Sequence, residues 1–304
     1  MFNSFLTVTQ QGLTLLLMIS AGFILSKKNI VQEQGIKQMT NILLYLVSPM
    51  VILRAFDMPF DPNLFVGLGV AVVCAIITHL LGITLGFLFI RKRLGESKPI
   101  YRFAVIYSNC GFMALPLIQA TIGNEGLFYG VAYVFVFTIF VWTQGMHMIC
   151  HKRISLWQII INPGIIGTGI AIILFVFSIK LPDFIKNTVD ILSGVNTPLA
   201  MIIIGASLAG VSWDKTFFKK EILISTMLRL LIIPGVLYFI LSFFNPQETI
   251  YKACMISASA PIAAYLPLFS AKYEKDTELA GKLVAFSTVC SMITMPIWVM
   301  LIRV

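Results

Sequence analysis

The sequence predicts an all-α membrane protein in which ten transmembrane helices form two inverted repeats of five. Three observations lead to this prediction: an apolar composition, an alternation of basic and neutral connections, and two apolar segments that are interrupted at matching places. The chain of 304 residues is 58% hydrophobic and 12% charged, with a mean hydropathy of +0.92. Soluble domains carry about a quarter charged residues, so this composition indicates an integral membrane protein.

Ten segments are apolar and long enough to cross a bilayer, which takes about 20 helical residues. The connections are short and leave no room for a separate soluble domain, so residues 1–304 are predicted to form a single transmembrane domain. The predicted spans are Phe5–Leu25, Met39–Phe56, Leu64–Ile90, Phe103–Ile122, Leu127–Cys150, Ile160–Ile179, Thr188–Gly210, Ile222–Phe244, Ile250–Ala271 and Leu279–Ile302.

The basic residues are distributed as in a membrane protein. Most of the 22 lysine and arginine residues follow the first, third, fifth, seventh and ninth spans. Examples are Lys92, Lys152 and Lys219. Short loops rich in lysine and arginine remain in the cytoplasm. The sequence therefore predicts a multi-pass protein of the cell membrane, with the lipid bilayer as its surroundings and both termini outside the cytoplasm. The net charge of +9 is thereby explained by topology, without a nucleic-acid partner.

Two spans contain residues that break helices. The fourth span carries the sequence SNCGFMALPL at 108–117, and the ninth carries SASAPIAAYLPL at 257–268. Backbone groups that lose their helical partners at bilayer depth must face protein or a wet cavity, because hydrocarbon cannot solvate them. Paired interruptions in two halves of a chain are the best sequence indication of a transporter's binding site.

A second matched pair supports two related halves. Ser48 precedes a proline in the second span, and Thr197 precedes a proline in the seventh. A half that contains five spans, an odd number, begins and ends on opposite sides of the membrane. The second half must therefore begin from the side opposite to the start of the first. The sequence thus predicts one repeat over about residues 1–150 and a second, inverted repeat over about 154–304.

Several stretches resemble the auxin efflux carrier family. They are AGFILSKKNI at 21–30, LYLVSPMVILRAF at 44–56, SNCGFMALPL at 108–117, INPGIIG at 161–167, NTPLAMIIIGASLA at 196–209 and ASAPIAAYLPLFSAKYEKD at 258–276. The resemblance implies two inverted five-helix repeats with crossed, broken helices four and nine, and a fold similar to that of bile acid sodium symporters. It also implies transport of organic anions, such as auxin in plants and malate or malonate in bacteria. The short connection after the fifth span is similar to that of bacterial-type members.

The interruptions offer a site for an anion without a buried cation. The first N–H groups of a helix lack intrahelical partners and carry roughly half a positive charge, so two such ends at the midplane attract a carboxylate. Proline suits the first helical turn, glycine lets backbone approach a ligand, and an asparagine amide donates hydrogen bonds. The predicted substrate-binding residues are Asn109, Cys110, Gly111, Phe112, Pro116, Ser257, Ser259, Pro261, Ser48, Gln144 and Arg229.

Two ionisable residues inside spans have alternative interpretations. Arg229 could attract the anion, or it could bind backbone carbonyls and serve packing. His79 lies about 150 residues earlier and could carry a coupling proton, or it could be a neutral, hydrogen-bonded histidine. Ser48 and Thr197 could line the cavity or bond to their own helices.

The sequence therefore predicts a secondary carrier of small organic anions that works by alternating access. A sodium-coupled symporter is the alternative of the same class, and a channel or a non-transporting sensor is the alternative of another. No motif for a nucleotide, a catalytic metal or a paired catalytic acid occurs, so we expect neither enzymatic activity nor a cofactor. The sequence leaves open the coupling ion and whether the chain forms a homodimer.

Overall fold

The computed structural model describes residues 2–90, 92–150, 157, 161–212 and 214–302. Within these ranges the chain is helical, and its one pair of bridged β residues lies at the centre of the molecule. The α-helices are α1 (Phe2–Lys27), α2 (Glu33–Ile42), α3 (Ser48–Phe56), α4 (Pro62–Phe89), α5 (Lys98–Ile106), α6 (Leu115–Thr121), α7 (Asn124–Phe140), α8 (Met146–Cys150), α10 (Pro163–Val176), α11 (Asp183–Gly194), α12 (Asn196–Ala209), α13 (Lys220–Met227), α14 (Ile233–Phe244), α15 (Glu248–Ser259), α16 (Tyr265–Lys272) and α17 (Thr277–Leu301).

These helices coincide with the apolar segments of the sequence. Six continuous helical stretches of the described chain are long and apolar enough to cross a membrane, as expected for a multi-pass membrane protein. They are Glu33–Phe56, Pro62–Phe89, Asn124–Cys150, Asp183–Ala209, Lys220–Phe244 and Thr277–Leu301. The start of the predicted sixth span and the basic residues Lys152 and Arg153 lie outside the described residues.

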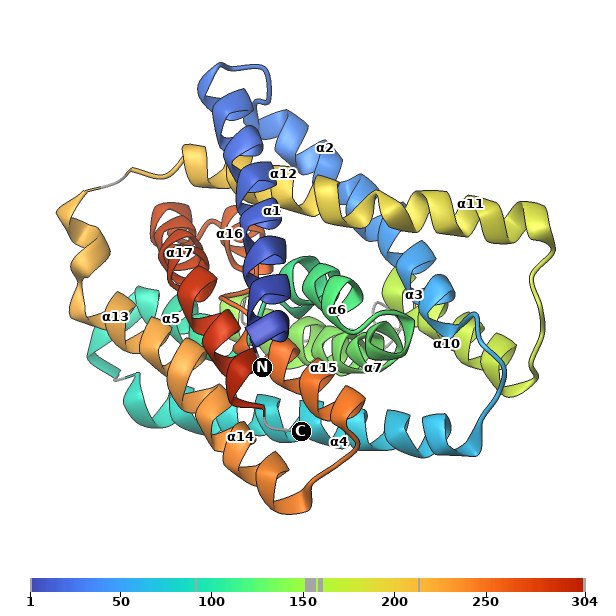
Figure 1. Cartoon of the computed structure of the whole chain (residues 1–304). Helices are drawn as coiled ribbons and strands as arrows, with labels where there is room; N and C mark the ends of the chain where they lie inside the picture. Colours follow the sequence, from blue (N-terminus) through green and yellow to red (C-terminus); the bar gives the residue numbers. More distant parts are fainter. Residues whose placement is uncertain (1, 91, 151–156, 158–160, 213, 303–304) are drawn as a thin grey trace.

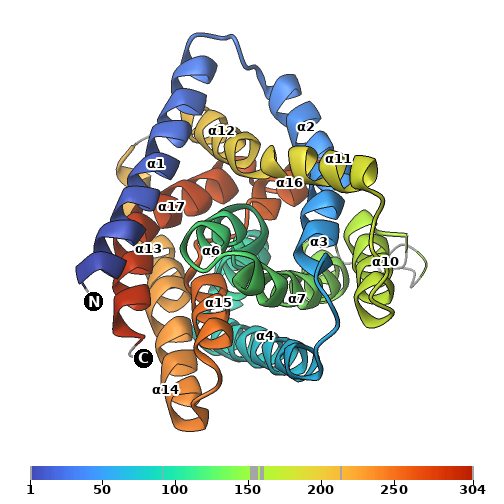
Figure 2. The same ribbon diagram turned by 45° about the vertical axis from the view of Figure 1, so that its right-hand side comes forward.

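The helices pack as two groups around a central set. In both ribbon views α11 and α12 lie toward the top, α4 and α14 lie toward the bottom, and α6, α7 and α15 run between them (Figures 1 and 2). Helix α1 packs along α12, and α3 packs on both α10 and α11. The α1–α12 contact depends on two glycines, because a Cβ at Gly22 would lie 2.3 Å from the Ile202 carbonyl oxygen and one at Gly205 would lie 1.9 Å from that of Ile19.

Three helices pass through π-helical turns, namely η1 (Leu43–Val47), η4 (Val141–Gly145) and η6 (Leu228–Ile232), and a fourth such turn, η3 (Cys110–Ala114), opens the helix that continues as α6. A π-helical turn leaves carbonyls free for other donors and is frequent at functional sites. Ser48 donates its hydroxyl to the Leu43 carbonyl at 2.8 Å, and the Tyr107 hydroxyl donates to the Phe140 carbonyl at 2.8 Å. Ser48 is thus a local hydroxyl donor at η1, whereas Tyr107 reaches the start of η4 from another helix interruption, 33 residues away in sequence.

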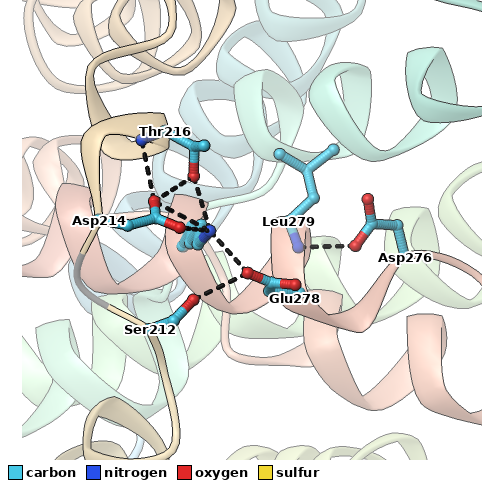
Figure 3. Close-up of polar contacts among 7 residues, drawn as sticks. Ser212, Asp214, Thr216, Asp276, Glu278 and Leu279 are labelled. Carbon is cyan, nitrogen blue, oxygen red and sulfur yellow. Dashed lines mark hydrogen bonds and ion pairs between the residues drawn. The ribbon is translucent and has the colours of Figure 1, made fainter.

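A polar cluster ties the connection after α12 to the start of α17 (Figure 3). The Lys282 ammonium lies 2.7 Å from a Glu278 carboxylate oxygen and 3.2 Å from the Asp214 carboxylate, and it donates to the Thr216 hydroxyl at 2.6 Å. The hydroxyl and then the backbone N–H of Thr216 hold the pKa of Asp214 below its usual range. This cluster fixes one end of α17 against the 210–219 segment.

Candidate functional site

Two helices are interrupted at the centre of the molecule, in the segments that carry the proline and glycine signals. The first break lies between α5 and η3, where Tyr107 has extended backbone angles of φ −102° and ψ 116°. The second break lies between Ser259, the last residue of α15, and Tyr265, the first of α16. Ala260 is extended, with φ −61° and ψ 149°, because a residue before proline avoids the helical region. Pro261 therefore ends a helix and does not begin one.

The two breaks cross and bond to each other. Ser108 and Ile262 form an antiparallel bridge. The Asn109 N–H donates to the Pro261 carbonyl at 2.7 Å, and the Ala263 N–H donates to the Tyr107 carbonyl at 3.0 Å. These bonds satisfy backbone groups that lost their helical partners, which is the requirement for irregular backbone at membrane depth.

Asn109 presents an unused donor at this crossing. Its side chain is 3% exposed, and its Nδ2 is buried without a hydrogen-bond partner. Its carbonyl accepts from the N–H groups of Met113 and Ala114, at 3.1 and 3.3 Å, and so starts the helix that follows. Gly111 has no atom within 4 Å of the position that a Cβ would take. The first break thus offers an amide donor beside a helix N-terminus with open space in front of it.

A cavity of about 360 Å³ begins at the first break. This volume is within the range of small-molecule sites, about 300–1,000 Å³. Its wall is mixed, with apolar and aromatic side chains between separate polar groups. Lys272 is the only charged residue among the described residues of the wall. The polar and aromatic-hydroxyl residues of the wall are Tyr45, Ser48, Asn109, Thr138, Asn162, Thr168, Asn196, Tyr265, Lys272 and Tyr273.

The cavity reaches the surface at one end of the molecule. Trp142 and Met146 line it near the end of the α7–α8 helix, and the exposed Lys272 lines it at the end of α16. Toward the start of α7, three phenylalanines pack together: the Phe128 ring centroid lies 4.6 Å from that of Phe56 and 5.1 Å from that of Phe175. All three are at most 2% exposed, and Phe56 lies about one helical turn beyond the wall residue Ile52.

The structure brings some of the predicted site residues to the cavity. Ser48, Asn109, Gly111 and Phe112 line it. Cys110 is fully buried away from the wall, and Pro116 lines a separate hollow of about 30 Å³ beside Arg54 and Gln119.

The predicted residues of the second break do not line the cavity. Ser257, Ser259 and Pro261 are absent from the described wall. The Ser259 hydroxyl donates to the Ile256 carbonyl at 3.2 Å, and the Pro261 carbonyl accepts from Asn109. The Ser257 hydroxyl is buried without a partner. This break contributes Tyr265 to the wall, from the first position of α16.

Three further predicted residues are engaged elsewhere. Gln144 Oε1 lies 2.5 Å from the Tyr107 hydroxyl, whose single proton it shares with the Phe140 carbonyl. Arg229 is fully buried and donates to backbone carbonyls, which is the second of the two interpretations that the sequence allowed. The His79 Nδ1 lies 2.7 Å from the Ala75 carbonyl oxygen, and its ring packs among aromatic rings, closest to Phe140 at 5.0 Å between centroids. None of the three is among the described residues of the cavity wall.

Sequence reasoning missed several residues of the wall. Asn162 and Asn196 both stand near a proline at a helix start, as their INPG and NTP motifs could have shown. Lys272 is one of the basic residues after the ninth span, which indicate topology, and its closeness to the second interruption is a further signal. Tyr45 and Trp142 lie in the π-helical turns η1 and η4, for which the sequence gives no recognisable signal.

In the described chain no group of three or more histidine, cysteine or acidic side chains is arranged to hold a metal ion.

Comparison with known proteins identifies the family of this chain. A family described as "membrane transport protein" matches residues 7–154 and 148–299. The chain belongs to this family. It is the family of the auxin efflux carriers, as the sequence motifs indicated.

Two archaeal relatives match nearly the whole chain. An "uncharacterized transporter" of Methanothermobacter thermautotrophicus is 24% identical over 313 residues, covering 97% of this chain and 98% of the relative. The "uncharacterized transporter MJ1031" of Methanocaldococcus jannaschii is 23% identical over 304 residues, covering 94% and 96%. This family member is therefore a membrane transport protein, and the names of these two relatives give no substrate.

Proposed function

We propose that this membrane transport protein is a secondary carrier of small organic anions and that the cavity at the first break is its substrate site. One observation carries the proposal. The wall combines the unpartnered Nδ2 of Asn109 with Lys272, and no acidic side chain occurs among the described residues of that wall.

The chemistry of the first break favours a carboxylate. The N–H groups at the start of the helix Cys110–Thr121 have no intrahelical partners and lie at the positive end of the helix dipole. Asn109 adds an amide donor at the same place, and Gly111 leaves room for the ligand to approach. A carboxylate accepts several hydrogen bonds at once, whereas a cation would find few free acceptors in such a site.

The packing supports two inverted repeats with ten spans. Helix α1 of the first half packs on α12 of the second, and α10 of the second half packs on α3 of the first. Gly22 makes the first of these contacts close, and Gly167 lies close to Pro49 in the second. Such an exchange of partners is what a two-fold axis in the membrane plane would produce, and it suits a carrier whose helix groups rock around a fixed site.

The distribution of charge suggests which side the cavity faces. Lys272 lies on the same kind of connection as Lys219, among those that the lysine and arginine excess assigns to the cytoplasm. We therefore interpret the structure as open to the cytoplasm and closed toward the outside by Phe56, Phe128 and Phe175. Both termini would then lie outside the cytoplasm. Labelling of single cysteines from each side of the membrane tests this topology; a terminus and Lys219 on the same side would contradict it.

The transport assignment can be tested with purified protein in proteoliposomes. Uptake of labelled malate, malonate, lactate and indole-acetate is measured over a range of concentrations, under separate proton and sodium gradients. We expect saturable uptake of at least one of these anions and no uptake of labelled choline. Flux that never saturates would favour a channel, binding without flux would favour a sensor, and strict dependence on sodium would favour the symporter alternative.

A further inference from the structure

Arg229 joins the two interrupted helices on the side away from the N-terminal donors. It lies in η6, is fully buried, and is the largest of the fully buried side chains among the described residues. Its Nη1 donates to the Ile106 carbonyl at 3.1 Å and lies 3.4 Å from that of Val105, and its Nη2 donates to the Ala258 carbonyl. Ile106 is the last residue of α5, and Ala258 is the last but one of α15. One guanidinium thus caps the C-terminal ends of both half-helices.

Two helix C-termini that meet inside a protein create a need for positive charge. The last four carbonyls of a helix have no intrahelical donor, and together they carry roughly half a negative charge. At the crossing, two such ends converge where water is excluded. A cation, either a bound ion or a fixed side chain, is the direct way to satisfy them.

The hydrogen-bond acceptors of Arg229 are uncharged carbonyl oxygens. No carboxylate is paired with it among the ion pairs of the described chain. Besides the three carbonyls, the hydroxyls of Ser108 and Ser257 belong to the same two chain segments and are buried without partners. Carbonyl and hydroxyl oxygens are the ligands that hard cations such as sodium and potassium use in proteins. The guanidinium therefore occupies a place whose ligands would otherwise suit a small monovalent cation.

We propose that Arg229 is a built-in cation that takes the place of an exchangeable sodium or potassium ion at the crossing of the two broken helices. A carrier with this residue needs no monovalent metal cation to hold the crossing together. Removal of the guanidinium leaves the carbonyls of Val105, Ile106 and Ala258 without their positive partner, so the altered protein acquires a requirement for such an ion.

The proposal can be tested by thermal unfolding of the detergent-purified protein, without any transport assay. Wild type and Arg229→Ala are compared in sodium, potassium and choline chloride at equal ionic strength. We expect the same unfolding temperature for wild type in all three salts. We expect Arg229→Ala to unfold at a lower temperature in choline chloride and to regain at least about 3 °C, saturably, in sodium or potassium chloride.

Two variants serve as controls. Arg229→Lys retains a cation, so it should fold and show no response to the salt. Arg102→Ala removes another arginine that donates to a backbone carbonyl, that of Ile90 at 3.4 Å, and should also show no selective response. A salt-independent unfolding temperature for Arg229→Ala, or its failure to fold in all three salts, would overturn the proposal. A saturable stabilisation of wild type by sodium or potassium would do the same.

A second measurement rests on the proposed carrier function. In proteoliposomes, wild-type uptake of the anion should be equal in sodium, potassium and choline media, and Arg229→Ala uptake should be stimulated several-fold by the metal cation that stabilises it. Sodium-dependent uptake by wild type would overturn the role of Arg229. Absence of any anion uptake would refute the proposed function and leave the unfolding result to decide on Arg229.

Discussion

The two breaks are similar in sequence and different in what they leave free. At the first break, the side-chain Nδ2 of Asn109 has no hydrogen-bond partner, and Gly111 borders open space. At the second, Pro261 has no N–H, the Ile262 N–H donates to the Ser287 hydroxyl at 3.1 Å, and the Ala263 N–H donates to the first break. The backbone N–H groups of Ile262 and Ala263 at the second break are therefore used by the protein itself, although the Ser257 hydroxyl remains without a partner.

This difference indicates a division of roles between the halves. We therefore propose that the first break recognises the ligand and that the second break holds the first in its extended shape through the Pro261 carbonyl and the Ala263 N–H. The sequence predicted a site built from two equivalent helix ends. In such a site Ser257 and Ser259 would line the cavity as Asn109 does. The helices that carry His79 and Arg229, at corresponding places of the two halves, also differ. His79 lies among aromatic rings, whereas Arg229 binds the C-terminal carbonyls of both half-helices.

The largest effect on ligand affinity is expected at Asn109. Asn109→Ala removes a donor to a charged acceptor, which costs about 1.5–3 kcal/mol and weakens anion affinity about 10- to 150-fold. Ser259→Ala at the second break should leave affinity unchanged. Concentration-dependent uptake measures both, with Asn187→Ala, an exposed asparagine of α11, as the control. Equal losses at the two breaks would contradict the division of roles.

The second break should show its effect in stability. Ser287→Ala leaves the buried Ile262 N–H without an acceptor and should lower the free energy of unfolding by about 1–3 kcal/mol, with anion affinity unchanged. Ser291→Ala is the matched control, because its equally buried hydroxyl bonds to the Thr288 carbonyl of its own helix and, although it lies 3.9 Å from Met113 Sδ, accepts from no backbone N–H of either break. Denaturation of the detergent-purified variants gives the comparison. Unchanged stability of Ser287→Ala together with weakened anion binding would contradict the structural role assigned to the second break.

A smaller effect is expected at the mouth of the cavity. Lys272 is exposed, so Lys272→Gln should raise the half-saturating anion concentration by a factor of only about 1.5–5, corresponding to about 0.2–1 kcal/mol. The increase should shrink as salt is added, because screening weakens exposed charges. Lys219→Gln, at an exposed lysine outside the described wall, is the control. A loss of anion affinity as large as that of Asn109→Ala would show that the main recognition group lies at the mouth of the cavity and not at the break.

The smallest effect is expected at His79, the candidate for a coupling proton. Its ring lies behind the cavity wall, with Nδ1 bonded to its own helix and Phe140 stacked on it. His79→Gln should therefore leave the response of uptake to a proton gradient unchanged. Loss of that response with intact anion binding would establish His79 as a proton carrier and give the first half a role in coupling.

The sequence predicted the apolar segments and the positions of both breaks, because helix-breaking residues at membrane depth have few structural solutions. It placed Pro261 in the first turn of a helix, whereas the extended Ala260 puts that proline inside the break. It could not predict which side chains face the cavity. That outcome depends on helix rotation, which the π-helical turns change by one residue at Tyr45 and Trp142. The bonds of Arg229 join segments more than 120 residues apart in sequence, and no local pattern reports them.

The most direct test of the central claim is an experimental structure with the transported anion bound. The claim predicts a carboxylate oxygen within hydrogen-bond distance of Asn109 Nδ2 and of the first N–H groups of the helix Cys110–Thr121, with no contact to Ser257 or Ser259. An anion held by those two serines, or by Lys272 without Asn109, would contradict the assignment of recognition to the first break.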